Sequence, residues 1–137
     1  MGRIDVEFTV ANYTDVVLRD QGLRADDAVR RTRVHGIVDT GAARLVLPQR
    51  VADELHLKPT GTTTVRYADN RTAQRTIVGD VWLELAGRAS VFSAVVEPDR
   101  ETALIGAIVL EELDLVADCA TQSVHPRDPH GMITEIE

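Results

Sequence analysis

Short apolar segments separated by turn-forming residues dominate this 137-residue chain. The longest uninterrupted apolar stretch runs only from Ala103 to Leu110, too short to cross a bilayer. Residues 4–10 alternate between apolar and polar, which is the two-residue period of a strand with one buried face. Because no long crossover helix interrupts the segments, we expect an all-β barrel or sandwich. Further strands are expected at residues 34–38, 45–47, 63–67, 76–85, 89–96, 104–105, 115–117 and 132–136.

Helical spacing is found in only two places. Between residues 49 and 57, the apolar side chains of Val51, Ala52 and Leu55 fall on one helical face. Residues 107–113 show a similar spacing, so two short helices are expected.

The segment between the first two expected strands has a weaker pattern. Residues 15–18 either continue the first strand or begin another. Residues 19–33 are polar and charged, with Gly22 as a breaker, and a loop or short helix is expected there. The chain is long enough for one core, so residues 1–137 are expected to form a single domain.

Charge and cysteine content narrow the functional classes. The chain has 15 Lys and Arg residues against 22 Asp and Glu residues, a net charge of −7, so a nucleic-acid partner is not expected. The single cysteine, Cys119, excludes an internal disulfide and is interpreted as a buried structural thiol. Residues 1–6 include Asp5 where a secretion signal would be apolar. We therefore expect a cytoplasmic protein with no membrane partner.

A strand at residues 34–38 leads directly into Asp39, Thr40, Gly41 and Ala42. A carboxylate at the end of an apolar strand is unfavourable unless it is exposed, paired or functional. Small residues after Asp39 keep the turn narrow, so a substrate or another backbone can approach the carboxylate. The tripeptide alone is equally compatible with a polar β-turn in which the aspartate caps a loop.

Residues 34–118 resemble the retropepsin-like aspartic proteases, the single-domain relatives of pepsin and of retroviral proteases, and small prokaryotic members are the most similar in pattern. Residues 37–42 are similar to the active-site motif of that family, and residues 45–48 to the strand and proline that follow it. Residues 67–71 look like the flap hairpin, and residues 103–106 look like the second motif, which packs behind the catalytic turn. The resemblance implies a closed, barrel-like fold with one or two short helices.

The resemblance also implies a role for individual residues. Asp39 is the expected catalytic residue, and Thr40 and Gly41 support its turn. Thr40 would hydrogen-bond to a second subunit across a two-fold axis. Substrate contacts are expected at Ala42, Tyr67, Ala68, Asp69 and Asn70, and the structural second motif comprises Leu104, Ile105 and Gly106.

Peptide hydrolysis by aspartates needs two carboxylates that share one proton. One acts as a base on water and the other as an acid on the amide. The chain has one Asp-Thr-Gly, because Asp80 and Asp118 both lack the following Thr-Gly. We therefore expect a homodimer in which each subunit contributes Asp39 to one site. An endopeptidase of this kind acts on a peptide or protein and needs no metal or other cofactor.

Two other interpretations remain open. The same fold can form a dimeric peptide-binding module without turnover, because a fold does not determine function. Asn70, at a position where relatives often have glycine, favours a stiffer or more open flap and so this alternative. The second interpretation is a monomeric β-domain in which the Asp39 turn is purely structural.

The remaining candidates have simpler structural interpretations. His35 is expected in the core or at its rim rather than as a catalytic partner, and Trp82 in the core. A metal site at His125, Asp128 and His130 is disfavoured because prolines interrupt the segment, which is interpreted as a solvated turn.

Three arginines, Arg66, Arg71 and Arg75, cluster near the expected flap. They either favour acidic residues on the substrate or form a solvated strand face. The solvated face is the simpler interpretation.

Overall fold

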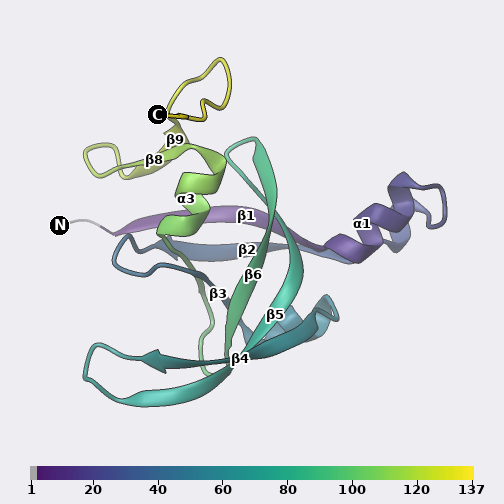
Figure 1. Cartoon of the computed structure of the whole chain (residues 1–137), viewed down its shortest axis with the longest axis horizontal. Helices are drawn as coiled ribbons and strands as arrows, with labels where there is room; N and C mark the ends of the chain where they lie inside the picture. The colour runs from purple at the N-terminus through teal and green to yellow at the C-terminus, as the bar shows by residue number, and fades with distance from the viewer. Residues whose placement is uncertain (1–2) are drawn as a thin grey trace.

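Strands make up much of residues 3–137, which the computed structural model describes (Figure 1). Met1 and Gly2, which the single-domain prediction and the N-terminal signal argument include, lie outside the described residues. The strands are β1 (Ile4–Asn12), β2 (Arg31–Val38), β3 (Leu45–Pro48), β4 (Lys58–Arg66), β5 (Thr72–Leu85), β6 (Arg88–Glu97), β7 (Ala103–Ile105), β8 (Leu115–Asp118) and β9 (Ser123–Pro126). The helices are α1 (Tyr13–Asp20), α2 (Gln49–Glu54) and α3 (Ala107–Leu113), with a 3-10 turn at Asp26–Ala28.

Six strands close into a barrel in the order β1-β2-β7-β3-β6-β5, and pairing of β1 with β5 completes the circle. The predicted all-β, barrel-like fold is therefore confirmed. β4 pairs only with β5, and these two long strands extend as a hairpin beyond the barrel (Figure 1). β8 and β9 form a separate two-stranded sheet.

The core lies inside the barrel, where alternate residues of each strand point inward. Along β5, for example, Val81, Leu83 and Leu85 are buried while Glu84 is exposed. This alternation follows the two-residue period of a strand. Burial of each large apolar side chain contributes about 1.5–3 kcal/mol to folding.

The position of β7 determines where the functional residues meet. β7 runs parallel to β2 on one side and antiparallel to β3 on the other. The strand is therefore inserted between two strands that are consecutive in the chain. This arrangement places the loop that follows β2 beside Gly106, which follows β7.

Residues 15–18 belong to helix α1, so the prediction of a strand there is wrong. The side-chain oxygen of Asn12 accepts a hydrogen bond from the backbone N–H of Asp15 at 3.2 Å and caps the helix. The side-chain amide of Asn12 also donates to the carbonyl of Leu55 at 2.9 Å. These contacts outweigh the strand preference of Val16 and Val17.

Asp15 is buried, with 1% of its side chain exposed, and is the centre of a charged network. Its carboxylate accepts hydrogen bonds from the backbone N–H of Arg30 at 3.0 Å and from Arg30 Nε at 2.8 Å. Arg24 forms a second ion pair with the same carboxylate. The Arg30 guanidinium is the main reason that the pKa of Asp15 falls from its ordinary value of 3.8 to about 2. This network attaches α1 to the segment before β2.

Two predictions near the C-terminus are wrong. Residues 132–136 form no strand, because β9 occupies the edge of β8 and the Ile133 N–H donates to the Asp114 carboxylate at 3.0 Å. Cys119 is exposed rather than buried, since it lies in the turn between β8 and β9.

Two aromatic side chains, His35 expected in the core or at its rim and Trp82 expected in the core, lie on the outside of the barrel. His35 is exposed on β2, and its Nε2 lies 3.1 Å from a carboxylate oxygen of Asp5, so it is not a core residue. Trp82 is half-buried and packs against the small apolar cluster of Ala11, Val16 and Val29, at the side of the barrel rather than inside it.

None of the helices that residues 3–137 form has the length and apolar character needed to cross a membrane.

We expect replacement of Asp15 by Asn to destabilise the fold by about 2 kcal/mol at pH 7. Because the folded-state pKa of Asp15 lies below its ordinary value, its contribution is present above about pH 4 and is lost as the pH falls toward 2. Urea unfolding of wild type and Asp15→Asn at pH 7 and at pH 3 measures this difference. The difference in stability between the two proteins should shrink at the lower pH.

Asp20→Asn is the matched control, because Asp20 also pairs with an arginine but is exposed. Equal unfolding midpoints for all three proteins at pH 7 would contradict the role of Asp15.

Candidate active site

The turn that follows β2 holds Asp39 at the protein surface. The backbone N–H of Asp39 donates to the carbonyl of Ile105 on β7 at 3.0 Å. The N–H of Gly41 donates to Asp39 Oδ1 at 3.0 Å, and the N–H of Ala42 donates to the Asp39 carbonyl at 3.1 Å. The hydrogen bond to Oδ1 holds the carboxylate in a defined orientation. The second carboxylate oxygen, Oδ2, accepts no hydrogen bond from residues 3–137.

Helix α3 supports this turn from behind. The first N–H groups of a helix have no partner within the helix. Here the N–H of Ala107 donates to the carbonyl of Ala42, and the N–H of Ile108 donates to the carbonyl of Ala43, both at 2.9 Å. The two expected motifs therefore contact each other through backbone hydrogen bonds.

Gly106 allows this close contact. A Cβ atom at this position would lie 2.4 Å from the carbonyl oxygen of Arg44 and 2.6 Å from the carbonyl carbon of Ala43. Both neighbours are backbone atoms, which cannot move aside without displacing the turn. The glycine is required for lack of space and not for its backbone angles, since its φ is −85°.

The flap is the tip of the β4–β5 hairpin. The N–H of Tyr67 donates to the carbonyl of Arg71, and the N–H of Asn70 donates to the carbonyl of Tyr67, both at 2.9 Å. Asn70 has φ of 70°, a left-handed conformation that asparagine tolerates better than most residues. The hairpin expected at residues 67–71 is therefore found there.

A groove of about 770 Å³ lies between the Asp39 turn and the flap. In Figure 1 the loop from β2 to β3 and the tip of the β4–β5 hairpin lie on the same side of the molecule, opposite α1. Apolar side chains of Val46, Val95 and Leu104 form part of the wall of the groove. The other lining residues are Asp39, Gly41, Ala42, Ala43, Arg44, Thr64, Val65, Arg66, Tyr67, Ala68, Glu97 and Arg100.

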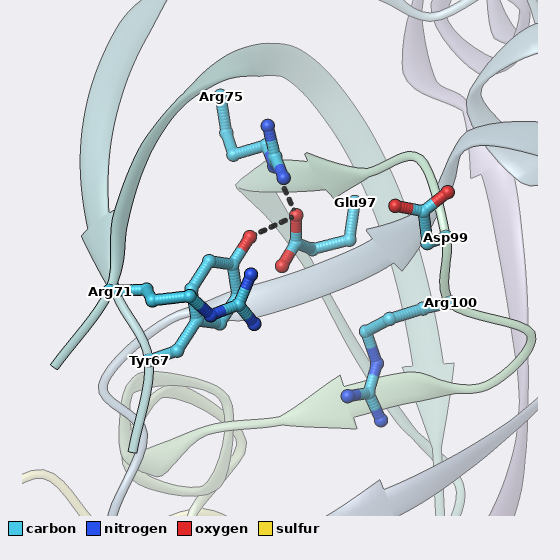
Figure 2. A pocket seen from close by; sticks show the side chains of 6 residues that line it. All are labelled: Tyr67, Arg71, Arg75, Glu97, Asp99 and Arg100. Carbon is cyan, nitrogen blue, oxygen red and sulfur yellow. Dashed lines mark hydrogen bonds and ion pairs between the residues drawn. The ribbon is translucent and has the colours of Figure 1, made fainter. Parts of the chain in front are cut away.

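A polar network connects the flap to the end of β6. Figure 2 shows that Tyr67 and Arg75 converge on one carboxylate oxygen of Glu97. The Tyr67 hydroxyl donates to this oxygen at 3.0 Å, and Arg75 forms an ion pair with it. The hydrogen bond to Glu97 raises the pKa of Tyr67. Arg71 lies over the Tyr67 ring, 5.2 Å from its centroid.

This network lines a smaller pocket of about 210 Å³ next to the groove. Arg75 is largely buried there and pairs with Glu97, so the prediction of a solvated strand face is wrong for this residue. Arg71, by contrast, is exposed and pairs with Asp69 at 2.7 Å.

A family model described as aspartyl protease matches residues 25–109. The match covers more than half of the chain and includes the Asp39 turn, the flap and the second motif. The chain belongs to the aspartyl protease family. The retropepsin-like assignment is thereby confirmed, and family membership supports a hydrolase that acts on peptide bonds. No curated protein matches the chain.

Within this aspartyl protease domain, the expected site residues occupy three kinds of position. Asp39, Gly41, Ala42, Tyr67, Ala68 and Leu104 line the groove. Ile105 and Gly106 are buried behind the turn, as expected for a structural motif. Three expected residues, Thr40, Asp69 and Asn70, do not line the groove. Thr40 is exposed in the Asp39 turn, and Asp69 and Asn70 are exposed in the flap turn. The catalytic role of Asp39, the substrate contacts and the role of Thr40 remain predictions.

Three charged residues of the groove were not recognised as site residues in the sequence, namely Arg44, Glu97 and Arg100. Parallel pairing of β3 with β6 brings Glu97 to the site, and this contact is distant in the sequence. A signal for Glu97 exists, because it follows an apolar strand just as Asp39 does. For the two arginines we find no local signal.

Among residues 3–137, no group of three or more His, Cys, Asp or Glu side chains is arranged to hold a metal ion. Nε2 of His125 instead lies 3.5 Å from Oδ2 of Asp118, across the β8–β9 hairpin.

We expect Gly106→Ala to destabilise the protein by about 1–3 kcal/mol, because the added methyl group overlaps the backbone of the active-site turn. Peptide cleavage by the folded fraction should fall as well, since Asp39 moves with the turn. Urea unfolding and a peptide-cleavage assay measure the two effects. Gly61→Ala is the matched control, because nothing lies within 4 Å of a Cβ atom there. If both variants unfold at the same urea concentration, the packing argument is wrong.

Proposed function

We propose that this protein is an aspartic endopeptidase in which Asp39 from each of two identical subunits activates one water molecule. The observation that carries the proposal is the position of Asp39, exposed in its Asp-Thr-Gly turn and lining a groove that the flap hairpin lines from the other side. Membership in the aspartyl protease family supports the same chemistry.

The need for a second subunit follows from the carboxylates of the groove. Besides Asp39, Glu97 is the one carboxylate that lines it within residues 3–137. Glu97 accepts a hydrogen bond from Tyr67 and pairs with Arg75, so its charge is already balanced within the subunit, unlike that of Asp39. A two-fold axis beside the turn supplies a second Asp39 in an equivalent setting.

The surface around the turn suits such a contact. Thr40 and Gly41 are exposed next to Asp39. On the adjoining helix α3, Ile108 leaves 48% of its surface exposed, although its backbone is bonded to the turn. An apolar side chain in this position would be covered when two turns face each other.

The proposed reaction uses these groups as follows. An extended peptide lies in the groove with its apolar side chains against Val46, Val95 and Leu104. One Asp39 carboxylate removes a proton from water, which attacks the peptide carbonyl, while the protonated Asp39 donates to the carbonyl oxygen. The first Asp39 then gives the proton taken from water to the amide nitrogen, the carbon–nitrogen bond breaks, and a hydroxyl of the tetrahedral intermediate returns its proton to the second Asp39.

We expect Asp39→Asn to lower peptide cleavage by about 10²- to 10⁴-fold, because the amide cannot accept a proton from water. Circular dichroism and urea unfolding should match the wild type, since Asp39 is exposed. Cleavage of a diverse peptide pool from acid to neutral pH is the measurement. Equal cleavage by both proteins would exclude Asp39 as the catalytic residue.

Mixing the two chains tests the shared site. When the wild type is refolded with a ninefold excess of Asp39→Asn, random pairing gives about one tenth of the wild-type subunits a wild-type partner. Activity should therefore drop to about one tenth of that of the same amount of wild type refolded alone. Unchanged activity would show that each chain acts independently.

The alternatives give different results in these assays. A peptide-binding module would bind extended peptides without cleaving them in either form. A monomeric domain with a structural Asp39 turn would remain monomeric in sedimentation at every concentration.

A further inference from the structure

Three arginines of the groove have no acidic partner. Arg44, Arg66 and Arg100 all line it, and none forms an ion pair with a carboxylate of residues 3–137. Every other arginine except Arg50 does form one. In a chain with a net charge of −7, unpaired guanidinium groups are thus concentrated in the one groove that contains Asp39.

Two carboxylates line the groove with these arginines, and the one besides Asp39 is already paired. Glu97 lines the same groove, but its charge is balanced by Arg75 and its oxygen also accepts the Tyr67 hydroxyl. Figure 2 shows Arg100 on the other side of the small pocket, away from this network. The positive charge of Arg44, Arg66 and Arg100 therefore remains available to a ligand.

Neutral groups hold two of the side chains in place. Arg44 Nη2 donates to Ser93 Oγ at 2.9 Å. Arg100 Nε donates to the carbonyl of Thr102 at 3.0 Å, and its Nη2 donates to Thr102 Oγ1 at 3.3 Å. A guanidinium group has five N–H donors, so each arginine keeps donors for a carboxylate. Arg66 is exposed at the end of β4, just before the flap turn.

We propose that the groove selects peptides that carry Asp or Glu beside the apolar residues flanking the cleaved bond. The proposal rests on the proposed function, since it treats the groove as the substrate site. Arg44 follows the catalytic turn, Arg66 is on the flap hairpin and Arg100 precedes β7, so the three positive charges surround the groove from separate segments. Acidic side chains at more than one peptide position would find a partner. The apolar walls contact the residues between them.

The size of the preference follows from the exposure of the arginines. A partly exposed pair of a guanidinium and a carboxylate contributes up to about a fivefold change in affinity. We therefore expect a peptide with two acidic residues to bind about ten- to twentyfold more tightly than the same peptide with Gln in both places.

The test uses binding to the Asp39→Asn chain, which does not depend on turnover. Fluorescence anisotropy compares peptides that share an apolar centre and carry Glu, Gln or Lys on either side. Glu peptides should bind most tightly and Lys peptides least. Arg44→Gln, Arg66→Gln and Arg100→Gln should each reduce the Glu-over-Gln preference by about two- to threefold.

Arg50→Gln is the matched control, because Arg50 is also without an ion pair within residues 3–137 but lies on α2, outside the groove. This variant should keep the full preference. Arg66→Glu provides a second measurement in which misfolding is not a concern, since Arg66 is exposed. It should shift the preference toward Lys peptides.

Equal binding of Glu and Gln peptides, no binding of any peptide, or an equal effect of Arg50→Gln would overturn this inference. Cleavage that depends on Asp39 but shows no acidic preference would leave the proposed function intact and refute only the specificity. A strong preference for acidic peptides in binding, without cleavage by the wild type, would refute the proposed function and leave the specificity of the groove intact.

Discussion

The contact between the Asp39 turn and Gly106 is the constraint on which the site depends. The turn has no side chain that could anchor it, because it consists of small residues. Its position is set by hydrogen bonds from its backbone to β7 and from the start of α3 to its carbonyls. These bonds form only because Gly106 allows the two backbones to touch. The orientation of the Asp39 carboxylate is therefore a property of backbone packing between segments about 65 residues apart in the chain.

The other wall of the groove is held by polar contacts rather than by backbone packing. Tyr67 and Arg75, both in the hairpin, contact one oxygen of Glu97, which is only 12% exposed. Because Glu97 is satisfied within the subunit, it gives the groove no unpaired negative charge. The same contact that holds the flap down thus leaves the charge of the groove to Asp39 and to the arginines.

Features that depend on neighbouring residues could be predicted from the sequence. The Asp39 turn, the Asn70 turn and helix α3 each carry a local signature, and each is found where expected. The errors come from distant contacts. Residues 15–18 form a helix because Asn12, whose side chain also donates to the Leu55 carbonyl, caps it. Arg30 and Arg24 pair with Asp15 of this helix, and residues 132–136 are kept from pairing by Asp114. The acidic and basic residues that complete the groove were missed for the same reason, since strand pairing across the barrel brings them together.

The insertion of β7 between β2 and β3 has a consequence for the order in which the molecule matures. A nascent chain contains Asp-Thr-Gly long before the ribosome adds Ala103 to Ile105, the strand that fixes it. Until then β2 and β3 lack the neighbour that separates them, and the turn has no partner for its backbone. The Asp39 carboxylate therefore reaches its final orientation only after most of the polypeptide has been made. The topology thus makes the geometry of this turn a late product of synthesis.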